Sequence, residues 1–96
     1  MKKQIANITL IIPYKRAGNI ISQEPVDFTV FEDDDHYCLI PCLPEDEIRI
    51  ANLPTELRFS MQDGKPVSLR GKRDGNFHVI QDAVECMREK KIVAFS

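Results

Sequence analysis

The sequence of 96 residues is 43% apolar and 29% charged, which matches a soluble domain with room for one compact core. We expect a single domain over residues 1–96 that needs neither a metal nor a disulfide for stability. No stretch reaches the ~18 to 20 apolar residues of a membrane span, and no small-residue cleavage site follows the apolar N-terminal run, so neither a membrane segment nor a signal peptide is expected. Three cysteines without repeated spacing favour a reducing compartment, and the expected location is cytoplasmic.

The net charge of −2 conceals a segregation of charge along the chain. Residues 1–23 carry four basic and no acidic side chains, residues 24–47 carry nine acidic and no basic ones, and residues 48–96 carry nine basic and six acidic ones. Residues 24–47 are therefore a block of negative charge, which attracts basic surfaces and repels nucleic acid.

Alternating apolar side chains predict a first strand over residues 6–12, which Pro13 is expected to end. Residues 16–19 predict a turn, because Gly and Asn tolerate positive φ. We expect Ile20 and Ile21 to pack on the core from a loop that follows this turn.

The same alternation predicts a second strand over residues 26–32 and a third, apolar on both faces, over residues 37–40. The three aspartates at 33–35 repel one another and favour water, so they predict a tight turn between these strands. Pro41 and Pro44 lack the N–H that a ladder needs, so the third strand is expected to end, bulge or lie at an edge near them.

Three further segments in the middle of the chain are predicted to form short strands. Residues 45–47 predict a second acidic turn, and residues 48–50 a short fourth strand. Residues 57–61 and 67–69 predict a hairpin. We expect a loop of about five residues from 62 to 66, because pairing Met61 with Val67 keeps the apolar side chains on one face and removes Pro66 from the ladder.

The last element is an amphipathic helix over about residues 77–90, with Asp74 or Asn76 as its cap. Residues 92–95 predict a short final strand at a sheet edge. The order of elements predicts an α+β domain: an antiparallel, strongly curved or barrel-like sheet of five to six short strands with one C-terminal helix packed on it.

A zinc site between strand and helix is one alternative, since two sets of possible ligands have compatible spacing: His36, Cys38 and Cys42 on the strand, and His78, Asp82 and Cys86 on the helix. Pro41 interrupts the strand and no Cys-x-x-Cys is present, so buried structural thiols are the preferred interpretation, with no metal and no cofactor.

Catalytic patterns are lacking. Cys86 lies near the C-terminal end of the predicted helix and Cys38 lies beside the aspartate run, and both positions disfavour a thiolate. No nucleophile elbow or phosphate loop is present. We expect a protein without enzymatic activity.

The leading functional hypothesis is a small non-catalytic binding protein, of inhibitor or adaptor type, that engages a basic protein surface through an acidic patch. Exposed carboxylates around an apolar centre are typical of a protein interface. The candidate partner-binding residues are Phe31, Glu32, Asp33, Asp34, Asp35, Tyr37, Glu45, Asp46 and Glu47.

The alternative is a nucleic-acid or anion-binding module at the junction of hairpin and helix, using Arg58, Arg70, Lys72 and Arg73. Phe31 and Tyr37 are the only rings expected to be exposed for base stacking, and both lie beside the aspartate run, which disfavours nucleic acid. A homodimer through the edge at residues 92–95 is a further possibility.

Overall fold

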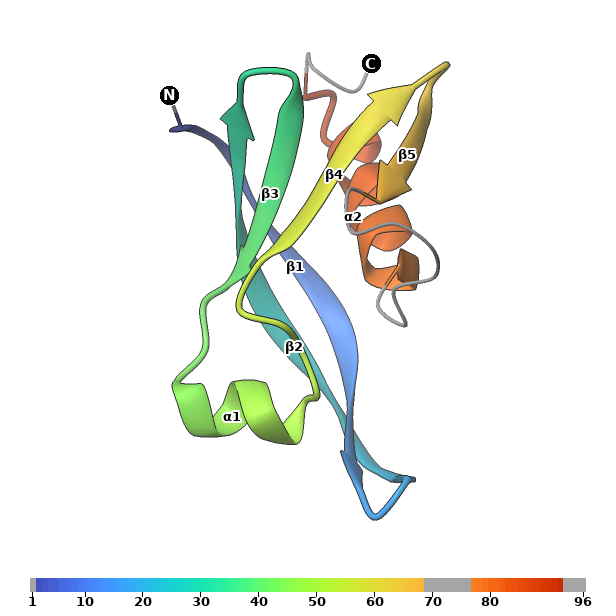
Figure 1. Ribbon diagram of the computed structural model, residues 1–96. Coiled ribbons are helices and arrows are strands. Elements are labelled where there is room, and N and C mark those ends of the chain that lie inside the picture. Colours follow the sequence, from blue (N-terminus) through green and yellow to red (C-terminus); the bar gives the residue numbers. More distant parts are fainter. Residues whose placement is uncertain (1, 69–76, 93–96) are drawn as a thin grey trace.

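The described residues form a five-stranded antiparallel sheet and two helices (Figure 1). The computed structural model describes residues 2–68 and 77–92. The strands follow one another in the sheet in chain order, and the elements are β1 (Lys2–Arg16), β2 (Asn19–Asp33), β3 (His36–Pro41), α1 (Glu45–Ile50), β4 (Leu57–Gln62), β5 (Lys65–Ser68) and α2 (Phe77–Glu89). The α+β class, the antiparallel sheet and the C-terminal helix are confirmed. The sheet is open, with β1 and β5 at its edges, so closure into a barrel is not observed.

The hairpin of β1 and β2 is longer than the sequence pattern predicts, because each strand has 15 residues. Pro13 does not end β1: it pairs with Gln23, and β1 lies at an edge of the sheet, where proline is tolerated. The predicted turn is confirmed, with Ala17 and Gly18 at φ 52° and 81°. The placement of Ile20 and Ile21 on the core is wrong, since both lie in β2 and are 57% and 54% exposed.

The alternating apolar residues of the strands lie on the inner face of the sheet, as the sequence predicts. Across the strands, Val30 lies opposite Leu39, which in turn lies opposite Leu57, and all three are buried. The Asp34–Asp35 turn between β2 and β3 is confirmed, and β3 ends at Pro41 as expected. The register places Phe31, Cys38 and Arg58 side by side on the outer face.

The predicted acidic turn and fourth strand are wrong, because residues 45–50 form the helix α1. Pro44 precedes the helix, and three carboxylates in its first turn complement the positive end of the helix dipole. Asn52 adopts φ 54° after the helix, and the N–H of Leu53 donates to the carbonyl of Ile48 at 3.1 Å, which is the bonding of a Schellman cap. These start and stop signals outweigh the three-residue alternation of the sequence.

The predicted five-residue loop between β4 and β5 is also wrong. Asp63 and Gly64 form a two-residue turn with φ 52° and 78°, the signs that a type I′ hairpin requires. Met61 therefore lies opposite Pro66, and Ser60 opposite Val67. Turn geometry determines this register rather than the parity of the apolar residues, and proline is tolerated because β5 is an edge strand.

Helix α2 packs against both β1 and β5, the two edges of the sheet. Its apolar face, predicted by the spacing, is buried: Val79, Ile80, Ala83, Val84 and Met87. Figure 1 shows the helix beside β4 and β5, with β1 to its left. The predicted cap residues 74 and 76 lie outside the described residues, as do residues 93–95 of the predicted final strand and dimer edge.

The turn between β1 and β2 provides a test of this backbone geometry. Alanine at φ 52° is strained, whereas asparagine tolerates that region, so Ala17→Asn should raise the free energy of unfolding by about 1 kcal/mol. Gly18→Ala should lower it by a similar amount, because Gly18 has φ 81° and open space around it, so only the backbone is affected. Urea denaturation measures both, and equal stability of the two variants would contradict the turn.

Candidate functional site

The first predicted acidic cluster lies at the tip of the β2–β3 hairpin. Asp34 and Asp35 form its turn and are exposed, while Glu32 and Asp33 at the end of β2 are half-buried. In the register of β1 and β2, Lys2 lies opposite Asp33 and Lys3 opposite Glu32. Opposite charges at facing positions stabilise an antiparallel pair, so the basic N-terminus compensates part of this cluster.

The two aromatic residues proposed with this cluster lie on different faces of the sheet. Phe31 lies opposite Cys38 on the outer face, whereas Tyr37 lies opposite Phe59 on the inner face. The rings of Tyr37 and Phe59 have centroids 5.5 Å apart. Burial raises the pKa of the Tyr37 hydroxyl, and the charge of Glu32 and its hydrogen bond raise it further. Both Phe31 and Tyr37 are half-buried, so they do not form one exposed aromatic patch.

The second acidic cluster is the first turn of α1, where Glu45, Asp46 and Glu47 are all exposed. Within the described part of the chain, none of these three carboxylates forms an ion pair. Burial raises the pKa of the Tyr14 hydroxyl, and the charges of Glu47 and Glu24 raise it further, so both carboxylates lie near this ring. Glu47 of α1 and Glu24 of β2 therefore both act on this ring.

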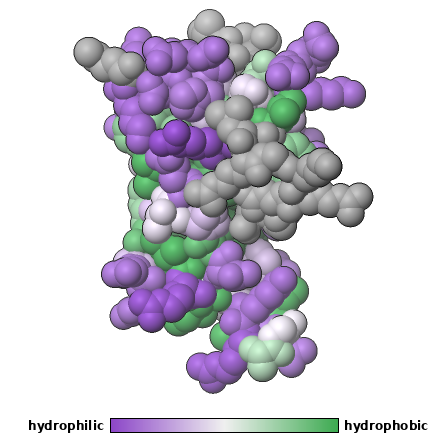
Figure 2. Space-filling model, viewed as in Figure 1, coloured by the Kyte–Doolittle hydropathy of each residue, from purple (hydrophilic) through white to green (hydrophobic). Residues whose placement is uncertain are grey.

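The structure does not bring the two acidic clusters together, because they lie at opposite ends of β3. The six residues of β3 extend about 20 Å at ~3.3 Å per residue. Figure 2 shows hydrophilic surface at the top, over the β2–β3 turn, and at the lower left, over α1, with hydrophobic surface between them. The single acidic patch of the hypothesis is thus two separate surfaces.

Arg58, a candidate of the alternative anion site, interacts with Glu56 through its Nε, which donates to Oε1. The Nζ of Lys2 donates to Oε2 of the same carboxylate at 3.1 Å. The hydrogen bond from Arg58 lowers the pKa of Glu56, although burial opposes the shift. One of the four anion-site candidates therefore already has an acidic partner, and the other three, Arg70, Lys72 and Arg73, lie outside the described residues.

The potential metal ligands are dispersed. Cys38 is buried, Cys42 is exposed with its Sγ 3.2 Å from Oγ1 of Thr29, and Cys86 is half-buried on α2. All three thiols are free. Among residues 2–68 and 77–92, no three His, Cys, Asp or Glu side chains lie close enough to hold a metal ion.

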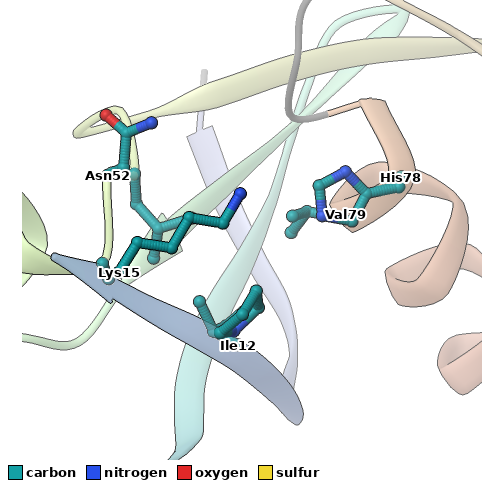
Figure 3. Close-up of a pocket in the computed structure, with 8 residues that line it drawn as sticks. Ile12, Lys15, Asn52, His78 and Val79 are labelled. Carbon is teal, nitrogen blue, oxygen red and sulfur yellow. The ribbon is translucent and has the colours of Figure 1, made fainter. Parts of the chain in front are cut away.

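A small cavity, which the sequence patterns do not reveal, lies between β1, the segment after α1 and the first turn of α2 (Figure 3). Its volume is about 120 Å³. It is lined by Ile12, Pro13, Lys15, Ala51, Asn52, Leu53, His78 and Val79. The residues come from three distant parts of the chain, so only the fold brings them together.

Comparisons with protein-family models, with curated proteins and with solved structures found no match to this chain. Within the described residues, no helix has the length and apolar character needed to cross a membrane.

The thiols provide a test of the site chemistry. Burial raises the pKa of the Cys38 thiol, and the charge of Glu56 raises it further, while Lys2 and Arg58 oppose the shift. We expect a maleimide at neutral pH to modify Cys38 at least about ten times more slowly than the exposed Cys42, since the thiolate is the reactive species. Peptide mass spectrometry measures both rates, and Cys42→Ser should remove the fast phase. Equal rates at the two positions would contradict the buried, unreactive Cys38.

Proposed function

We propose that this protein is a non-catalytic binding protein, of inhibitor or adaptor type, that engages a basic protein surface through the acidic end of α1. The observation that carries the proposal is the first turn of this helix, with three consecutive exposed carboxylates. The three free thiols support action in a reducing, cytoplasmic compartment.

An apolar side chain lies next to these carboxylates. Ile50, in the last turn of α1, is 47% exposed, and with Asp46 and Arg49 it lines a shallow hollow. A large apolar side chain with a charged rim is typical of a protein interface, in which the centre is desolvated and the rim remains in contact with water. The carboxylates would accelerate encounter with a cationic partner, and Ile50 would supply buried apolar area after docking.

We favour the first turn of α1 over the β2–β3 turn as the partner-binding surface, because the two surfaces have different charged neighbours. Lys2 and Lys3 of β1 face Asp33 and Glu32, so the tip is partly compensated within the protein. On α1, Arg49 is the one basic side chain against three acidic ones, and Glu24 adds to the negative charge nearby. Within α1 itself, the three carboxylates therefore outnumber the one basic side chain.

Affinity capture with neutralised variants tests this proposal. The triple variant Glu45→Gln, Asp46→Asn, Glu47→Gln removes the charge without placing like charges at the positive end of the helix dipole. We expect the wild-type protein to capture a defined basic protein from extract of its native host, and the triple variant to retain less than about a tenth of it, since each 1.4 kcal/mol of lost affinity is tenfold. Quantitative mass spectrometry of the captured proteins measures the difference.

A matched control is available on α2, where Asp82, Glu85 and Glu89 are also exposed carboxylates on a helix. Neutralising these three changes the net charge equally and should leave capture unchanged. A second control, Asp34→Asn with Asp35→Asn, tests the other acidic surface. Equal capture by the wild-type protein and the α1 variant, with both folded by circular dichroism, would refute the proposal.

A further inference from the structure

The cavity between β1 and α2 has an apolar floor. Four of the residues that line it are buried: Ile12, Ala51, Leu53 and Val79. They belong to the main hydrophobic core, so the floor is fixed by the packing of the whole domain. The small apolar area that these side chains expose there is favourable for a short hydrocarbon group.

Among the described residues, the rim of the cavity is polar and carries no acidic side chain. It consists of Lys15 near the end of β1, Asn52 after α1 and His78 in the first turn of α2, all exposed at the surface. Figure 3 shows the side chain of Lys15 extending from β1 toward the imidazole of His78. The ammonium group and an N–H of the imidazole are hydrogen-bond donors, whereas the amide of Asn52 is directed away from them in Figure 3.

The convergence of these donors needs an explanation. Neither Lys15 nor His78 forms an ion pair with a carboxylate in the described part of the chain, and no Asp or Glu lines the cavity. An anion placed between the Lys15 ammonium and the His78 ring would accept hydrogen bonds from both. Hydrogen-bond donors beside apolar side chains are the arrangement that recognises a ligand with an anionic group and a hydrocarbon chain.

We propose that this cavity binds a short-chain organic carboxylate, with its carboxylate between Lys15 and His78 and its hydrocarbon body against Ile12, Leu53 and Val79. Lys15 and His78 donate hydrogen bonds to the carboxylate oxygens. The apolar floor favours an organic anion over inorganic phosphate, which has no hydrocarbon to place there.

The size of the cavity limits the ligand. A closed cavity of about 150 Å³ accommodates benzene. The volume of about 120 Å³ observed here therefore suits a body of three or so carbon atoms, as in butyrate, with the head at the open rim. The cavity shares no residue with the acidic first turn of α1. A negative result for carboxylate binding would therefore leave the proposed partner capture unaffected, and the reverse also holds.

Two-dimensional amide NMR with butyrate as the probe tests the proposal on the intact chain. We expect saturable shifts of the Leu53 and Val79 amides with a Kd of about 1 mM, the affinity of a small fragment. Butanol tests the need for charge and inorganic phosphate tests the need for the hydrocarbon body. Both should bind at least about ten times more weakly than butyrate.

Side-chain variants assign the donors. Lys15→Gln and His78→Gln should each weaken butyrate binding about tenfold, because each removes a charge-assisted hydrogen bond. Lys3→Gln, on the same strand and also exposed, is the matched control and should leave the affinity unchanged. The proposal is overturned if butyrate produces no saturable shifts, if butanol or phosphate binds as tightly, or if Lys15→Gln and His78→Gln bind like the control.

Discussion

The packing of α2 against both edges of an open sheet is the constraint on which the rest of the structure depends. The five strands run in chain order, so β1 and β5 are the farthest apart in the sheet, yet both contact this one helix. Ile80 and Met87 of α2 join the same core as Phe28 and Phe59 of the sheet, and all four are fully buried. Each such side chain contributes about 1.5–3 kcal/mol relative to exposure, so the helix and the curved inner face stabilise each other.

This architecture also determines where charge remains uncompensated. The antiparallel pairing of β1 with β2 places the basic N-terminus beside the acidic end of β2, and Glu56 accepts hydrogen bonds from both Lys2 and Arg58. The strong segregation of charge along the sequence is thus partly neutralised in space. The first turn of α1 lies at the other end of β3 from the β2–β3 turn and keeps its carboxylates exposed, which is why the proposed interface is there.

Sequence patterns predicted the elements whose periodicity is long and whose face is buried. The parity of β1 to β3 and the helical spacing of α2 belong to this class, since burial of one face imposes the pattern. The patterns failed where local backbone chemistry dominates. Pro44 precedes the helix α1 and Asn52 ends it, and the turn at Asp63 and Gly64 determines the register of β4 and β5. The cavity and the separation of the acidic clusters depend on contacts between distant segments, so no local pattern contains them.

Hydrogen exchange of backbone amides in the wild-type protein and in Met87→Ala tests most directly whether α2 holds the sheet together. Met87 is fully buried, and its truncation should cost about 2–5 kcal/mol. The account predicts that protection falls together in β1, β5 and α2, because the helix bridges both edges. Loss of protection in α2 alone, with wild-type protection retained in β1 and β5, would contradict it.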